Sequence, residues 1–192
     1  MEYLQPAELL KVLSIAKRHS TRDHCMFLLA YGHALRASEI ASLRLSDVKN
    51  GRIRCNRGKG SDHTVEELRE HANPLLNEKL ALAAWLRERE SDSEYLFTTR
   101  QSACIKRKQV YNAFRKCVEL ANIALDRLGP HNLKHAYASH LIRNGANLAF
   151  VQKAMGHAHI SSTTRYTHVS TSEAQAVSNR VLGNVFASVA TV

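Results

Sequence analysis

The C-terminal third of the sequence gathers cationic and hydrogen-bonding side chains around one tyrosine. His131 and Lys134 lie three residues apart, so they share one face if this segment is helical. His157 follows Gly156, and Tyr166 comes nine residues later, after a link rich in serine and threonine. These residue types suit phosphate chemistry, because histidine and lysine can donate to phosphate oxygens and a phenol can serve as the nucleophile.

Two further cations lie upstream. Arg36 follows the predicted turn at Gly32, and Lys59 lies between two glycines in another turn. Phosphoryl transfer spreads negative charge over the equatorial oxygens, so catalysis depends mainly on positioning and on fixed donors. Arginine offers a fork that matches two oxygens, and lysine a point charge that can also protonate a leaving alkoxide. With enough converging cations this chemistry needs no metal and no other cofactor.

The overall charge favours a polyanionic partner. Lysine and arginine number 27 against 17 aspartates and glutamates, a formal net charge of +10. Such an excess attracts nucleic acid, and we expect double-stranded DNA as the partner. A predicted helix over 106–123 carries four basic candidates for backbone or groove contact: Lys106, Arg107, Lys108 and Arg115. The alternative is that this basic face is only solvated.

Other classes of protein are disfavoured. The four cysteines are scattered without a C-x-x-C spacing, so neither a disulfide framework nor a zinc ribbon is expected. His131 and His135 have the i, i+4 spacing of zinc helices, but the H-E-x-x-H glutamate is missing and we expect no metal site. No signal peptide and no apolar run of membrane-spanning length is visible, so we expect a cytoplasmic, nucleoid-associated protein without membrane contact.

Hydrophobic periodicity predicts a mainly helical fold with a small antiparallel sheet, an α+β arrangement. Asn50-Gly51 is a strong turn signal, and the alternating segment Arg52 to Cys55 after it predicts a strand. Thr64 to Leu76 stays open, because it could continue the sheet or form a helix. Helices are expected over Pro6 to His19, Asp23 to Tyr31, Ala37 to Leu43, Asn77 to Arg89, 106–123, Asn132 to Asn144 and Leu148 to Met155.

Taken in order, these motifs resemble the catalytic domain of tyrosine recombinases and phage-type integrases, most of all the Xer-like and small invertase-like members. The matching segments are HALRASEI with Arg36, RGKGS with Lys59, HNLKH with His131 and Lys134, ASHL, MGH with His157, and TTRYTH with Tyr166. The resemblance covers most of the chain, and the ordered set is far more specific than any one motif. It implies the recombinase catalytic-domain fold, mainly helical with a small antiparallel sheet.

The resemblance also implies roles. Tyr166 attacks the scissile phosphate, forms a 3′-phosphotyrosyl link and frees a 5′-hydroxyl, which Lys59 protonates as it leaves. His131 either orients the phosphate or accepts the tyrosine proton, and Glu39, one turn after Arg36, holds a neighbouring cation or imidazole. Three side chains bind the non-bridging oxygens: Arg36, Lys134 and His157. The protein is expected to act as a tetramer on DNA.

Two departures from the family pattern stand out. Lys134 replaces an arginine, so the charge stays but the two-pronged contact is lost, and we expect slower strand transfer. Few residues precede Arg36, so an N-terminal clamp domain is expected to be absent. We predict a catalytic domain over 1–175 and a C-terminal tail helix over 176–192, whose valine stripe either packs on its own core or docks on a neighbouring protomer.

Two other functions remain as alternatives. A DNA-binding accessory protein could keep the fold while Lys134 impairs catalysis, and a type IB topoisomerase-like enzyme would use a similar site. A covalent protein–DNA adduct would exclude the accessory protein. Recombination between two sites, rather than relaxation of supercoils, would exclude the topoisomerase.

Overall fold

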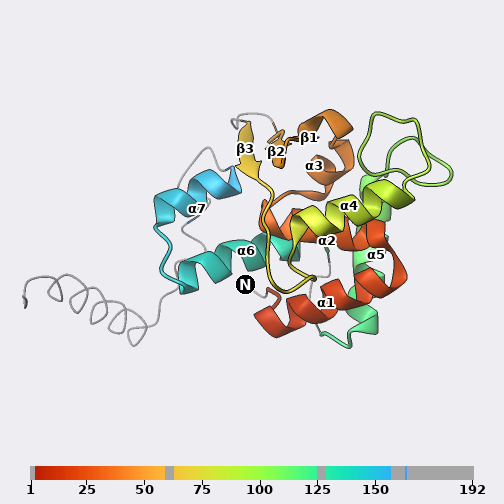
Figure 1. Ribbon diagram of the computed structural model, residues 1–192. Coiled ribbons are helices and arrows are strands. Elements are labelled where there is room, and N and C mark those ends of the chain that lie inside the picture. The colour runs from red at the N-terminus through yellow and green to blue at the C-terminus, as the bar shows by residue number, and fades with distance from the viewer. Residues whose placement is uncertain (1–2, 59–62, 125–128, 157–162, 164–192) are drawn as a thin grey trace, which may run out of the picture.

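The computed structural model describes residues 3–58, 63–124, 129–156 and 163 (Figure 1). Its helices are α1 (Pro6–His19), α2 (Thr21–Gly32), α3 (Ala37–Ser42), the 3-10 turn η1 (Leu45–Asp47), α4 (Glu78–Glu88), α5 (Arg107–Leu120), α6 (His131–Arg143) and α7 (Leu148–Met155). The strands β1 (Val48–Lys49), β2 (Arg52–Cys55) and β3 (Thr64–Glu67) form one antiparallel sheet in the order β1-β2-β3. The predicted mainly helical fold with a small antiparallel sheet is confirmed. Within the described ranges, no helix is long and apolar enough to cross a bilayer.

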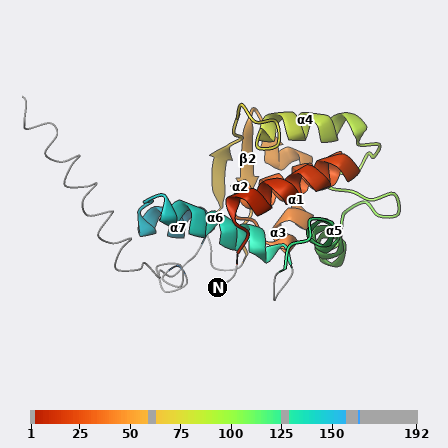
Figure 2. The ribbon, with the colours of Figure 1, turned by 90° about the horizontal axis from the view of Figure 1, so that it is seen from below.

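Helix α2 forms the centre of the fold. Its run from Cys25 to Leu29 is buried on every side, and the helix contacts α1, α4, α5 and α6 (Figures 1 and 2). Phe27 meets Phe114 of α5 edge to face, with ring centroids 5.5 Å apart. A helix that is apolar all round must be enclosed by other elements. The C-terminal end of α2 is therefore held firmly, and the chain that leaves it leads to Arg36.

The sheet is built from local turn chemistry and long-range pairing. Asn50 and Gly51 both have positive φ (52° and 70°), as a type I′ hairpin turn requires, and Lys49 faces Arg52 across it. The ambiguous segment after Thr64 proves to be a strand only as far as Glu67, where it pairs with β2. Hydrogen bonding to β2 decides its structure, because propensity in strands yields to tertiary context.

A second, smaller apolar cluster joins α6 and α7 to the loop that follows α2. Its buried members are Ala34, Tyr137, Ala138, Val151 and Met155. Helix α7 ends as predicted at Gly156, which adopts the left-handed conformation at φ 61°. This cluster brings the loop over residues 33–36, called the Ala34 loop below, together with the middle of α6 and the end of α7.

Candidate active site

Arg36 stands at the N-terminal end of α3 and is held there by Glu39. The Glu39 carboxylate accepts hydrogen bonds from the Arg36 amide and from its Nη1, both at 2.7 Å. Burial alone would raise the pKa of Glu39, but these hydrogen bonds and the nearby Lys134 lower it overall, so the carboxylate is ionised. The Arg36 side chain is 45% exposed while that of Glu39 is 5% exposed. A buried anion thus orients a guanidinium whose remaining donors reach solvent.

Lys134 lies in the first turn of α6 and is buried. Its Nζ donates to the carbonyl oxygens of Ala34 at 2.8 Å and Met155 at 2.7 Å. Burial, with the charges of Arg36 and Arg57, lowers the pKa of Lys134 from 10.5 to about 7, although Glu39 opposes the shift. The structure therefore brings Arg36, Glu39 and Lys134 together, and ties Lys134 to two backbone segments.

This pKa makes the free energy of unfolding depend on pH. Between about pH 7 and pH 10.5 the unfolded chain binds more protons at Lys134 than the folded chain does. Stability therefore rises with pH in this window, by up to about 1.4 kcal/mol per pH unit, and the cost of burying the charge is present in full below it. We expect wild-type protein to gain stability relative to Lys134→Met between pH 7 and pH 9, measured by urea unfolding.

Lys153→Met is the matched control, because Lys153 is exposed on α7. Its difference from wild type should stay constant over the same pH range. A constant difference for Lys134→Met as well would contradict the lowered pKa.

His131 begins α6 and is exposed, three residues before Lys134. Its ring lies edge to face with that of His135, at a centroid distance of 5.7 Å. A Cβ placed on Gly129 would come within 2.7 Å of His131 Nδ1, so glycine is needed for the ring to approach the preceding turn. The start of a helix also favours anions, because the positive end of the helix dipole lies there. His131 is thus placed where a phosphate would be stabilised.

Three predicted catalytic residues lie outside the described part of the chain: Lys59, His157 and Tyr166. The tail over 176–192 lies outside it too. The described chain ends at Gly58 before Lys59 and at Gly156 before His157, and Thr163 is the one described residue between Gly156 and Tyr166.

Arg57 is the first residue of the RGKGS segment but had no predicted role, and its side chain is fully buried between segments that lead to predicted catalytic residues. Nη1 donates to the His33 carbonyl at 2.9 Å and to the Ala34 carbonyl at 3.2 Å, and Nη2 donates to the Ala154 carbonyl at 3.1 Å. Its place two residues before Lys59 was the one signal that could have found it. In a sequence, a buried arginine looks the same as the solvated arginines of the neighbouring strand.

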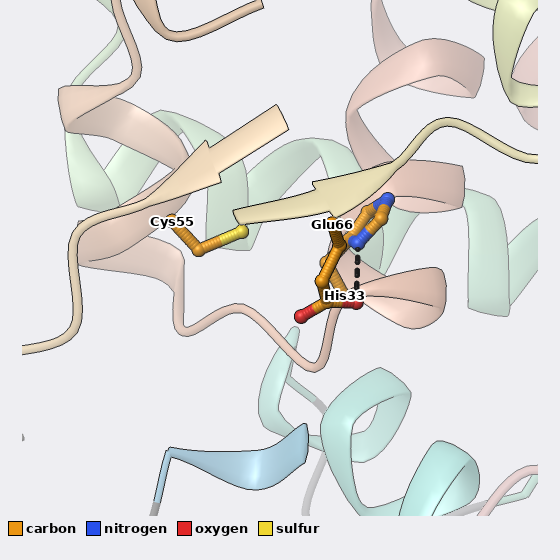
Figure 3. A group of neighbouring side chains, drawn as sticks. All are labelled: His33, Cys55 and Glu66. Carbon is orange, nitrogen blue, oxygen red and sulfur yellow. Dashed lines mark hydrogen bonds and ion pairs between the residues drawn. The ribbon is translucent and has the colours of Figure 1, made fainter. Parts of the chain in front are cut away.

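A buried network of charges continues beneath the sheet. His33, at the end of α2, bonds through Nδ1 to Glu66 at 2.9 Å (Figure 3). Through Nε2 it bonds to Glu78 at 3.1 Å. Burial would lower the pKa of His33, but the two carboxylates raise it overall. Burial also raises the pKa of the neighbouring Cys55 thiol to about 11. Both ring nitrogens of His33 face carboxylate oxygens, which only accept hydrogen bonds, so both nitrogens act as donors and neither offers a lone pair to a metal. We therefore interpret His33, Glu66 and Glu78 as an ion-pair network, with the Cys55 thiol beside it.

The basic end of α5 is exposed. Lys106, Arg107 and Lys108 stand at its N-terminus, where the helix dipole already disfavours cations. Arg115, two turns further, pairs with Glu119 at 2.6 Å. Within the described residues, no ion pair neutralises the three terminal cations, so they present a positive potential to solvent. Arg115, in contrast, has an acidic partner on the same helix.

Comparisons with known proteins agree on one family. Residues 2–173 match the phage integrase family. The tyrosine recombinase XerC of Thermodesulfovibrio yellowstonii is 35% identical over 153 residues, which are 77% of this chain and 50% of that protein. The tyrosine recombinase XerA of Pyrococcus furiosus is 31% identical over 169 residues, which are 86% of this chain and 57% of that protein. The chain thus spans about half the length of these relatives.

Solved structures show the same fold. A crystal structure of XerA recombinase has a TM-score of 0.75 at 25% identity, covering 94% of this chain and 65% of that one. XerH recombinase bound to its difH substrate also has a TM-score of 0.75, at 22% identity over 92% of this chain and 53% of that one. The expected tyrosine recombinase catalytic-domain fold is confirmed. With its match over residues 2–173 and relatives more than 30% identical, the chain belongs to the phage integrase family.

Proposed function

We propose that this domain is a site-specific recombinase that cuts and rejoins double-stranded DNA through a 3′-phosphotyrosine at Tyr166. The observation that carries the proposal is the arrangement of Arg36. Its half-exposed guanidinium is oriented by buried, ionised Glu39 and lies beside Lys134. An arginine held in this way is ready to bind an anion, and the family match supports a DNA phosphate as that anion.

In the proposed first step, the Tyr166 oxygen attacks phosphorus and the bond to the 5′ oxygen breaks. Tyr166 gives up its phenolic proton, and His131 is the residue proposed to accept it or to orient the phosphate. Lys59 donates one proton to the departing 5′ oxygen, so protons balance over the step. The phosphotyrosine keeps the energy of the broken bond, and a 5′-hydroxyl from a partner strand reverses the reaction to rejoin DNA. Neither ATP nor a metal enters this scheme.

Arg36, Lys134 and His157 are proposed to bind the non-bridging oxygens. For Lys134 the structure adds a constraint, because two of the three N–H bonds of its ammonium are used by backbone carbonyls. We propose that the third contacts phosphate. A phosphate anion in contact with Nζ would favour the charged ammonium and raise the pKa of Lys134 again.

The proposed partner is double-stranded DNA, with Lys106, Arg107 and Lys108 of α5 contacting the backbone and Arg115 in a lesser role. We propose that the protein acts in the cytoplasm on nucleoid DNA and assembles as a tetramer there. Residues 176–192 are proposed as a tail helix that either packs on the domain or docks on a neighbouring protomer. These proposals rest on the resemblance and on the exposed charges of α5.

A trapping experiment tests the proposed function and does not require the target site to be known. Sheared, nicked DNA from the source genome is incubated with the protein, and complexes that survive detergent are recovered and sequenced. We expect adducts at one recurring sequence, with phosphotyrosine as the only new phosphoamino acid. Two copies of the recovered sequence on a plasmid should then recombine.

Each alternative predicts a different outcome. DNA binding without any adduct would favour the accessory protein. Adducts and relaxation of supercoils, without exchange between two sites, would favour the topoisomerase-like enzyme. The tyrosine recombinases among the relatives favour the recombinase over both.

A further inference from the structure

Three segments that lead to proposed catalytic residues meet at the Arg57 guanidinium. Arg57 itself lies two residues before Lys59. It donates to the carbonyls of His33 and Ala34, in the loop that leads to Arg36. It also donates to the carbonyl of Ala154, in the last turn of α7. One side chain thus connects the β2–β3 segment, the loop before α3 and the end of α7.

The carbonyls that accept from Arg57 are backbone groups that need hydrogen-bond donors from outside their own segments. The last carbonyls of a helix have no partner within it, and Ala154 is in the last turn of α7. Ala34 has a φ of 50°, a left-handed conformation that is unfavourable for alanine and persists only when its surroundings hold it. A Cβ on Gly156 would come within 2.8 Å of Arg57 Cδ, so the end of α7 also packs directly on the Arg57 chain.

Lys134 forms a second bridge between the Ala34 loop and the end of α7. Its Nζ joins the Ala34 carbonyl to the Met155 carbonyl, next to the pair that Arg57 joins. Two buried cations therefore tie the same loop to the same helix end. Lysine at position 134 satisfies two carbonyls, whereas the arginine fork of Arg57 reaches three. Arg57 therefore holds more backbone groups in place than Lys134 does.

Carboxylates on β3 and α3 balance the charge of Arg57. Its Nη2 lies 3.4 Å from Glu66 and its Nη1 4.0 Å from Glu39, while the Thr64 hydroxyl accepts from Nε and Nη2 at 3.3 and 3.1 Å. A buried guanidinium is tolerated when its donors and charge are matched in this way. The side chain is fully buried. It therefore acts on protein groups and not on DNA.

We propose that Arg57 is a positioning residue for strand transfer, which holds the segments carrying Arg36, Lys59 and His157 in one register through their backbone carbonyls. The inference rests on the proposed function. Misplacing a catalytic group by about 1 Å can cost on the order of 10²-fold in rate, even when the change is remote from the chemistry. The effect of Arg57 should therefore appear in the cleavage rate and not in DNA affinity.

The first test measures single-turnover cleavage at saturating DNA, on the site recovered by trapping. We expect a fall of about 10-fold for Arg57→Lys and about 10²-fold for Arg57→Met, since lysine keeps the charge but not the fork. The Kd for DNA should stay within about twofold of wild type, because no phosphate contact is lost. Arg54→Met is the matched control, since Arg54 lies exposed on β2, three residues earlier. Its cleavage rate at saturation should equal that of wild type.

A second test uses protein without DNA. In Arg57→Lys, hydrogen exchange should speed up in peptides covering the Ala34 loop and the end of α7, and stay unchanged in α1. A residue that only contributes global stability would raise exchange in α1 as well. This arm also serves if Arg57→Met fails to fold.

The outcomes separate the inference from the proposed function. If wild type cleaves and both Arg57 variants cleave at the wild-type rate, the inference is overturned and the function stands. Exchange that is unchanged in the two peptides, or raised equally in α1, overturns it as well. If wild type forms no adduct, the proposed function fails and the inference falls with it.

Discussion

Replacing Tyr166 by phenylalanine is expected to abolish the covalent protein–DNA adduct and all recombination. Phenylalanine keeps the ring but lacks the oxygen that would bond to phosphorus. Removing a nucleophile from a covalent mechanism leaves no alternative route to the intermediate, and we expect a loss of at least about 10⁴-fold. The measurement is the yield of detergent-stable adduct on a nicked suicide substrate. DNA binding should be retained, because an uncharged hydroxyl contributes little to phosphate affinity.

Tyr95→Phe is the matched control for this variant. Tyr95 packs its ring 5.6 Å from the Arg44 guanidinium, in a segment that carries none of the proposed catalytic residues. Its loss of a hydroxyl should leave adduct formation unchanged. Adduct formation by Tyr166→Phe at the wild-type yield would show that another residue is the nucleophile, and phosphoamino-acid analysis would identify its type.

Arg36→Ala is expected to slow cleavage at saturating DNA by about 10²- to 10³-fold, as removal of a fixed donor to a developing anion does in other enzymes. The structure explains why the loss should be large. Glu39 holds the guanidinium by a charge-assisted hydrogen bond, so its orientation is fixed before DNA binds. Arg36→Lys should recover only part of the rate, because it keeps the charge without the fork.

Two further variants make the Arg36 result specific. Arg44→Ala removes an arginine that pairs with Glu94 at 2.7 Å on the surface, and should cleave at the wild-type rate. Glu39→Gln keeps the shape of the supporting side chain but loses its charge, and should fall between wild type and Arg36→Ala. Cleavage by Arg36→Ala at the wild-type rate would remove this residue from the proposed mechanism.

Much of the fold follows from local patterns in the sequence. Helix α1 runs from Pro6 to His19 and α7 from Leu148 to Met155, as their apolar spacing and flanking residues predict. The Asn50-Gly51 turn forms as its chemistry requires. The segment from Thr64 was ambiguous because its residues suit both a helix and a strand, and only pairing with β2 settles it. That pairing joins the segment to residues outside it, so the pattern within the segment does not predict it.

The candidate site, like the fold, is predicted by the sequence only in part. The order of Arg36, Lys59, His131, His157 and Tyr166 is visible in the sequence, because residue type and spacing are enough to indicate phosphate chemistry. Their roles remain predictions, and the variants above test those of Arg36 and Tyr166. The sequence also suggested a phosphate contact for Lys134, but the tertiary structure adds two carbonyl partners that lower its freedom to make one.

The sequence by itself determined the family, the mainly helical class and the set of groups able to act on a phosphate, since these depend on residue types and their order. Only the tertiary structure decided which cations are exposed and which are buried. Arg36 reaches solvent while Arg57 does not, although both are arginines between elements of secondary structure. The physical reason is that Arg57 is buried where carbonyls of α7 and of the Ala34 loop accept its hydrogen bonds. Packing around α2 and α6 brings these carbonyls together from separate parts of the sequence.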